Sequence, residues 1–160
     1  NLKEILLIMP SLGTRILGVL LYMIPWSESL IFGNHLFIKY PFTQIIQLPA
    51  IPIILIERSI PFGNLLLFLA IFIGLVRNNK VSYFLRFNAL QSLLINIGII
   101  IVSFIFEIIF SPFLNSLIIR TFSTTLLISL FSVIFYCVWS CTQGNEPNLP
   151  GISQATKMQL

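Results

Sequence analysis

The chain has 160 residues, of which 57% are hydrophobic and 9% are charged, and its formal net charge is +4. Soluble domains carry about 25% charged residues, so this composition excludes a water-soluble globular protein. The basic residues stand singly between apolar runs, which argues against a nucleic-acid partner. The sequence predicts an all-α integral membrane protein, because apolar runs of roughly 20 residues cross a bilayer as helices.

The first apolar run, residues 16–32, begins after Arg15 and predicts the first transmembrane helix. Pro25 removes one helical hydrogen bond, so we expect a bend there. Glu28 is expected close to the far membrane interface. The sequence Gly-Asn-His at residues 33–35 is expected to end the helix.

The next segment, residues 42–57, is interrupted by prolines and by two glutamines. Each uninterrupted apolar stretch in it is too short to cross the hydrocarbon core. We expect a short interfacial or re-entrant helical segment that ends at Glu57 and Arg58. A fifth crossing is the alternative interpretation.

The second span is predicted over residues 60–76, with Pro61 at a favourable first-turn position. Ala70 and Gly74 form a pair of small residues that allows another helix to approach closely. The short polar loop at residues 77–80 predicts that this span and the next form an antiparallel hairpin.

The third and fourth spans are predicted over residues 83–110 and 117–141. The third would be about 40 Å long at 1.5 Å per residue, so it must tilt or protrude from the bilayer. A polar tail, residues 142–160, completes a single membrane domain over residues 1–160.

Basic residues are distributed unevenly between the two sides of this four-span arrangement. Four spans place both termini on one side, where six Lys and Arg residues lie, against three on the other side. The positive-inside rule therefore predicts that both termini face the cytoplasm-equivalent compartment.

Polar side chains on the third and fourth spans recur at helical spacing. Those on each span fall within an arc of about 100°, so they share one helix face. Such a face is either a helix–helix seam or the lining of a hydrated path. The residues are Asn88, Ser92, Asn96, Ser103 and Glu107 on the third span, and Thr125, Ser129, Ser132, Tyr136 and Ser140 on the fourth.

No motif predicts a catalytic, cofactor or metal site. His35 is the single histidine and has no HExxH pattern around it, and no GxSxG or phosphate-binding glycine loop is present. Cys137 and Cys141 share a helix face but have no further metal ligands beside them. We expect them to be buried, unreactive thiols, with redox chemistry or lipid attachment as the alternative. The sequence therefore favours a protein that is not an enzyme.

One stretch is more specific than composition or periodicity: residues 74–97 read GLVRNNKVSYFLRFNALQSLLINI, with RFNALQ at residues 86–91. It resembles the signature of the small four-span membrane subunit of the translocon at the inner envelope membrane of chloroplasts (TIC), a family with plastid-encoded and cyanobacterial relatives. Residues 24–41 and 147–159 are similar to the same family more weakly. Asn96 stands where the family has an acidic residue, so a role that needs a charge there is not carried over.

The resemblance implies a core membrane subunit of the import translocon, contributing to the path of precursor proteins into the stroma. It implies other translocon membrane subunits and translocating precursors as partners, beside membrane lipids, and a location in the inner envelope membrane. In that membrane the charge distribution predicts that both termini lie on the stromal side. Arg77, Lys80 and Arg86 are expected to be interface anchors or partner contacts. A purely structural scaffold subunit is the alternative, followed by a small-solute transporter.

Overall fold

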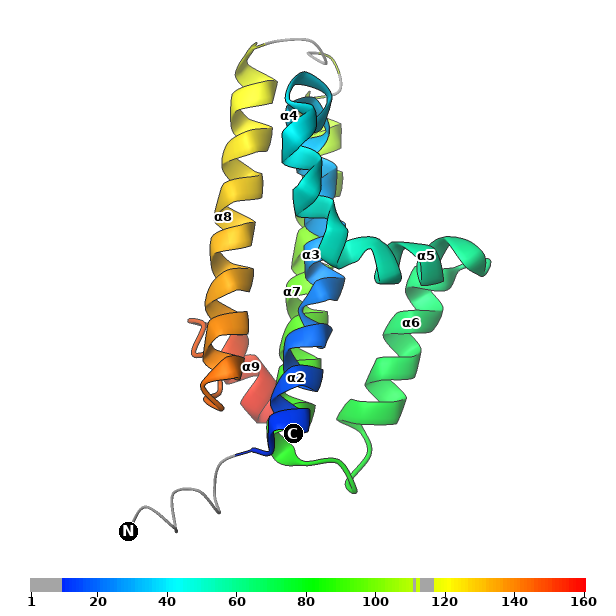
Figure 1. Cartoon of the computed structure of the whole chain (residues 1–160), viewed down its shortest axis with the longest axis vertical. Coiled ribbons are helices and arrows are strands. Elements are labelled where there is room, and N and C mark those ends of the chain that lie inside the picture. The colour runs from blue at the N-terminus through cyan, green and yellow to red at the C-terminus, as the bar shows by residue number, and fades with distance from the viewer. Residues whose placement is uncertain (1–9, 111, 113–116) are drawn as a thin grey trace.

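The computed structural model describes residues 10–110, 112 and 117–160, and within these residues it contains helices and no strand. Three helical runs are long and apolar enough to cross a membrane (Figure 1). They are Leu12–Lys39, α7 (Tyr83–Phe110) and α8 (Leu117–Thr142). The prediction of an all-α integral membrane protein is confirmed.

The first run extends further at both ends than residues 16–32. Ser11 caps its start, because the Ser11 hydroxyl accepts a hydrogen bond from the Thr14 amide at 3.3 Å. Gly33 does not end it, since its φ of −91° lies in the ordinary helical region. The helix ends at Tyr40, whose φ of −128° and ψ of 84° lie outside the helical region, as expected for a residue before a proline. Its pieces are α2 (Leu12–Leu21), α3 (Met23–Ser29), η1 (Leu30–Gly33) and α4 (Asn34–Lys39).

The segment between Tyr40 and the loop at residues 77–82 is a bent pair of helical runs. Its halves, Pro41–Ser59 and Gly63–Val76, are bent by 111° relative to one another. The second half corresponds to the predicted span over residues 60–76, and the first half covers the predicted interfacial or re-entrant segment over residues 42–57. The bent pair consists of η2 (Pro41–Ala50), α5 (Ile51–Ser59), α6 (Gly63–Ile71) and η3 (Phe72–Val76).

The bend itself has a clear backbone cause. Ile60 is extended, as expected for the residue before Pro61, and Phe62 has left-handed angles of φ 58° and ψ 29°. A Cβ at the next position, Gly63, would collide with the backbone carbonyl of Glu57, so only glycine fits. The chain therefore turns here instead of continuing as a straight helix.

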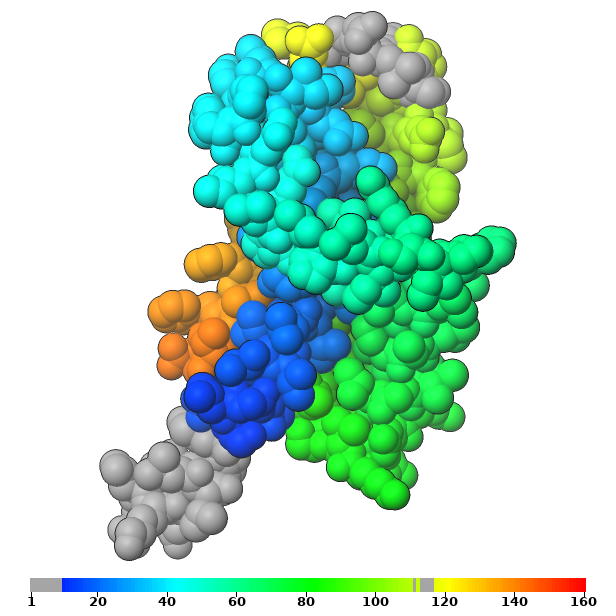
Figure 2. Space-filling view, turned by 45° about the vertical axis from the view of Figure 1, so that its right-hand side comes forward, coloured from blue at the N-terminus to red at the C-terminus, as the bar shows by residue number. Residues whose placement is uncertain are grey.

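Figure 1 shows α5 roughly perpendicular to the long helices at about mid-height and extending away from them, with α6 descending from its outer end. Figure 2 shows the segment η2–α5 crossing in front of α2–α3. One hydrogen bond anchors this crossing, because the Trp26 indole donates to the Ile46 carbonyl at 3.0 Å. The segment η2 is consequently held against α3 near the middle of the bundle.

The central helix is α7, which packs against α2, α3, η3 and α9 (Ile152–Gln159). The described ends of the chain, Pro10 and Leu160, lie at the same end of the bundle (Figure 1). The tail, predicted only to be polar, contains α9, which folds back onto α7 and buries Ser153 and Thr156.

Candidate functional site

A buried polar cluster joins the helices at the end of the bundle where Pro10 and Leu160 lie. Its centre is Asn88, which is fully buried. The Asn88 amide oxygen accepts hydrogen bonds from the Tyr22 hydroxyl and from the Cys141 thiol, both at 2.9 Å. The Asn88 amide nitrogen donates to the Phe84 carbonyl at 2.8 Å. The Asn88 side chain of α7 thereby connects the junction between α2 and α3, where Tyr22 lies, to α8.

The same cluster continues to the C-terminal tail through Gln91. Its amide nitrogen lies 3.9 Å from the Cys137 sulfur, and its oxygen accepts from the Ser153 hydroxyl at 3.3 Å. The Ser153 oxygen also accepts from the Leu149 amide at 2.7 Å. Cys137 and Cys141 are both free and buried, as expected from their shared helix face. The RFNALQ element therefore holds α8 and α9 against α7.

The predicted anchors lie at this same end. The Arg86 guanidinium donates to the Val76 carbonyl at 2.9 Å, so Arg86 fixes the loop between η3 and α7. The Lys80 backbone N–H donates to the Asn78 side-chain oxygen at 3.0 Å. The Lys80 and Arg77 side chains are exposed. Arg77 and Lys80 are available to headgroups or partners, whereas Arg86 also has an internal structural partner.

The remaining polar residues of α7 differ from one another in burial. Ser92 and Asn96 lie in the interior, and the Asn96 side-chain oxygen has no hydrogen-bond partner within the described residues. Ser103 is half-buried, and its hydroxyl donates to the Ile100 carbonyl of its own helix. Glu107 is exposed. The α7 residues are therefore interior near the start of the helix and open near its end.

The hydroxyl side chains of α8 form an outward ridge, which we call the α8 ridge: Thr125, Ser129, Ser132 and Tyr136. All four are exposed, whereas Ser140 is buried. The buried face of α8 lies roughly on the opposite side of the helix, at 100° per residue. The Thr125, Ser129 and Ser132 hydroxyls donate to carbonyls one turn earlier, at 2.8–2.9 Å.

An open groove of 490 Å³ runs beside the α8 ridge and is lined by Trp26, Phe131, Phe135 and Ser132. The Trp26 and Phe131 rings stack with centroids 4.5 Å apart. The α8 ridge and this groove together form a polar and aromatic outer surface. The sequence grouped Ser140 with the residues of the α8 ridge, whereas Ser140 is buried, and it did not predict that the ridge points outward.

A second polar surface was not predicted from the sequence. The bent pair brings Glu57 and Arg58 beside Glu28, and a cavity of 320 Å³ opens among them. The Asn64 amide donates to the Glu28 carboxylate at 3.3 Å. Glu28 and Glu57 were expected at membrane interfaces, whereas the bend at Gly63 brings them together. Carboxylates distant in sequence gave no helical spacing by which to find them.

The described residues contain no group of three or more metal-binding side chains. The fold defines a polytopic helical membrane protein, with both described ends at the same end of the bundle and its polar groups divided between an interlocked interior and an exposed outer surface (Figure 1).

Comparison with known proteins assigns this membrane protein to a family. Residues 6–156 match the family model described as chloroplast import apparatus Tic20-like, so the chain belongs to the Tic20-like family. A Tic20 family protein from Synechocystis sp. is 31% identical over 147 residues, which cover 91% of this chain and 92% of the relative.

Two further relatives come from photosynthetic eukaryotes. Protein TIC 20-II, chloroplastic, from Arabidopsis thaliana is 27% identical, with 91% of this chain and 72% of the relative covered. The Tic20 family protein Ycf60 from Porphyra purpurea is 28% identical, with 93% and 76% covered. The predicted family is confirmed. Its members point to a component of the chloroplast protein-import translocon, although the Synechocystis relative is not a chloroplast protein.

Proposed function

We propose that the chain is a core membrane subunit of the protein-import translocon in the plastid inner envelope, and that the outer surface of α8 contacts precursor proteins on their way to the stroma. We assign it no catalytic role. The observation that carries the proposal is the α8 ridge, which is exposed beside an aromatic groove. A ridge of hydroxyls facing bulk lipid would contribute nothing to the packing of the chain.

The chemistry of the α8 ridge suits a passing polypeptide. Inside a membrane, each backbone N–H of an unfolded chain needs an acceptor, because hydrocarbon supplies none. Ser129 and Ser132 use their hydroxyl protons within α8, so their oxygens keep free lone pairs that accept from a peptide. The stacked Trp26 and Phe131 rings offer apolar contact to its side chains.

Other translocon membrane subunits would complete the path. The described chain places its best-buried polar groups, Asn88 and Gln91, in closed hydrogen bonds, which leaves no room for a precursor among them. We therefore propose a path between the α8 ridge and neighbouring subunits rather than through this bundle. The stromal orientation of the termini rests on the excess of basic residues on their side.

Site-specific photo-crosslinking tests the proposal. A crosslinker at Ser132 is expected to form adducts with an arrested precursor in intact membranes. A crosslinker at Ile105 of α7, exposed on the far half of that helix, is the matched control and is expected to label lipid. Equal precursor adducts from both positions, or none from Ser132, would contradict the proposal.

A structural scaffold is the second candidate function, and the hydrogen-bonded cluster around Asn88 favours it. In that case the α8 ridge is a packed seam with a partner helix. Ser132→Cys distinguishes the two, because a water-soluble thiol reagent modifies a hydrated path and not a packed seam. Cys137 and Cys141 are buried and contribute little background labelling.

A further inference from the structure

A basic groove lies at the end of the bundle remote from Pro10 and Leu160, between α4 and the first turns of α8. Its volume is 330 Å³. We propose that this groove binds the phosphate headgroup of an anionic glycerophospholipid. The residues that carry this inference are His35, Lys39, Tyr40, Arg120 and Thr124.

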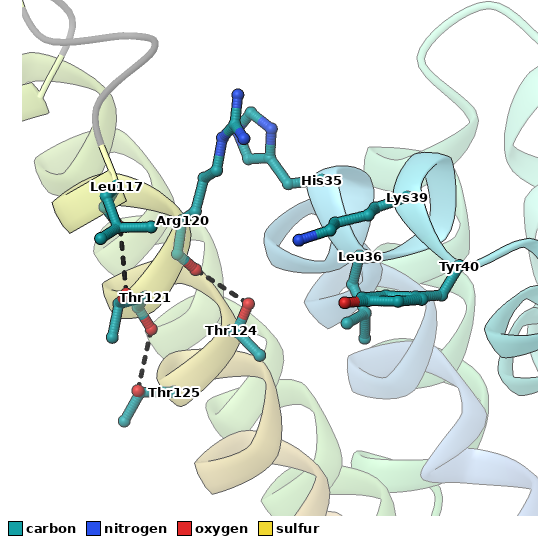
Figure 3. A pocket seen from close by; sticks show the side chains of 9 residues that line it. All are labelled: His35, Leu36, Lys39, Tyr40, Leu117, Arg120, Thr121, Thr124 and Thr125. Carbon is teal, nitrogen blue, oxygen red and sulfur yellow. Dashed lines mark hydrogen bonds between the residues drawn. The ribbon is translucent and has the colours of Figure 1, made fainter.

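The charges in the groove have one sign. Lys39 and Arg120 line it together with His35, and no acidic side chain among the described residues does. In Figure 3 the Arg120 side chain from α8 and the His35 side chain from α4 overlap at the top of the groove, and the Lys39 ammonium points from α4 toward α8. Within the described part of the chain, the one contact of the Lys39 ammonium is the Tyr40 ring, 5.3 Å from its centroid.

An anion is the missing counterpart of this arrangement. Two cations that converge on one groove repel each other, and a phosphate between them replaces that repulsion by two attractions. Arg120 offers a planar pair of donors that matches phosphate oxygens, and Lys39 supplies a point charge from the opposite wall. Thr124 donates its hydroxyl proton to the Arg120 carbonyl at 2.8 Å, so its oxygen is left to accept from a glycerol hydroxyl.

The position of the groove specifies a lipid rather than a free phosphate. It lies where the first membrane-spanning run and α8 reach their ends, the level of headgroups when the long helices cross the bilayer. Leu36 and Leu117 line it beside the charges, and Ile118 and Phe122 expose an apolar surface on the neighbouring face of the same turns of α8. Acyl chains would follow that surface while the headgroup stays among the cations.

Lipid binding by the full chain in detergent and in nanodiscs tests this inference. Native mass spectrometry is expected to show phosphatidylglycerol retained in preference to phosphatidylcholine. The double substitution Lys39→Gln with Arg120→Gln is expected to weaken phosphatidylglycerol binding about a hundredfold, because each of the two charge-assisted hydrogen bonds contributes about 1.5 kcal/mol, which is about tenfold. Lys157→Glu, at the opposite end of the bundle, changes the net charge equally and is expected to have no such effect.

Two further experiments distinguish charge from packing, and a lipid from a free phosphate. The exchange Lys39→Arg with Arg120→Lys keeps both charges and is expected to retain the lipid preference, whereas loss equal to that of the Gln pair would mean that packing, not charge, is responsible. Glycerol 3-phosphate at millimolar concentration is expected not to displace phosphatidylglycerol. Displacement would identify a site for a free phosphate, and an unchanged preference in the Gln pair would overturn the proposal outright.

Discussion

The two halves of α7 have opposite surroundings. All the fully buried residues of α7 lie between Phe84 and Ile99. Beyond them, Phe104, Ile105 and Ile108 expose most of their surface. The exposed second half is the more apolar of the two in sequence, because the first half contains Arg86, Asn88, Gln91 and Asn96. Apolarity alone therefore does not decide which half is covered by the chain itself.

The two halves of α7 differ in burial because different elements pack against each of them. α2, α9 and η3 surround the first half and add the hydrogen bonds of Asn88 and Gln91. The second half has mainly α4, η1 and α8 nearby, and α6 descends away from it because of the bend at Gly63 (Figure 1). The chain thus completes its own packing at one end, while lipid or partner subunits complete it at the other.

The sharpest test compares two phenylalanines of α7. Phe87 is fully buried and Phe104 is 61% exposed. Phe87→Ala is expected to lower the free energy of unfolding by about 3 kcal/mol, the lower end of the range for such cavities, because lipid supplies no hydrophobic transfer term. Phe104→Ala is expected to cost less than about 0.5 kcal/mol. Reversible unfolding in mixed micelles measures both, and equal losses would refute the division of α7 into two halves.

The bend between α5 and α6 is tested by substitutions at two glycines. A Cβ at Gly63 would collide with the Glu57 carbonyl, so Gly63→Ala is expected to destabilise by about 2 kcal/mol and to straighten the pair. Gly74 has no neighbour within 4 Å of a built Cβ, and it lies in a helical run. Gly74→Ala is expected to be neutral or slightly stabilising.

Spin-label distances between the α5 and α6 ends would report the bend angle directly in both glycine variants. A Gly63→Ala protein with unchanged stability and unchanged distances would show that the turn does not depend on the absent side chain.

The polar cluster is tested at Asn88, which makes three hydrogen bonds. Side-chain hydrogen bonds in membrane proteins average about 0.6 kcal/mol, so Asn88→Leu is expected to cost about 1.8 kcal/mol. Ser103→Ala, on the open half, removes one bond within α7 and is expected to cost a few tenths of a kcal/mol. A double-mutant cycle of Asn88→Leu with Tyr22→Phe measures the coupling energy of the 2.9 Å hydrogen bond between Tyr22 and Asn88. A coupling energy of zero would show that this bond does not stabilise the fold.

Sequence patterns located the long helices because a helix of membrane-spanning length needs only an uninterrupted apolar run. They located the shared polar face of α8 for the same reason, since spacing fixes which residues share a face. They did not fix which way that face points, because hydroxyl side chains occur both on the α8 ridge and on the buried face around Leu127, which contains Ser123 and Ser140.

Two other features depended on information that local patterns lack. The bend requires Phe62 in a left-handed conformation and close contact between Gly63 and Glu57, neither of which periodicity reports. α9 begins after Gly151, which has a φ of 80°, and its eight residues are too polar to resemble a packed helix until Gln91 and Ser153 are seen together. The cavity beside Glu28 follows from the bend and was hidden for the same reason.

The smallest effect is expected at Phe62, whose φ of 58° is costly for any side chain with a Cβ. The Phe62 ring is 82% exposed and contributes no packing within the described chain. Phe62→Gly is therefore expected to stabilise the isolated chain by up to about 1 kcal/mol, because relief of about 1–2 kcal/mol of strain exceeds the entropic cost of glycine of about 0.5–1 kcal/mol.

The same substitution is informative in the assembled membrane. A strained aromatic residue that a glycine would improve upon has a use for its side chain outside the chain's own fold. If the ring contacts lipid or a partner subunit, Phe62→Gly raises the unfolding free energy of the purified chain yet lowers its yield in the native complex. A variant that is more stable alone and equally abundant in the complex would show that Phe62 is only a tolerated strain at the turn between α5 and α6.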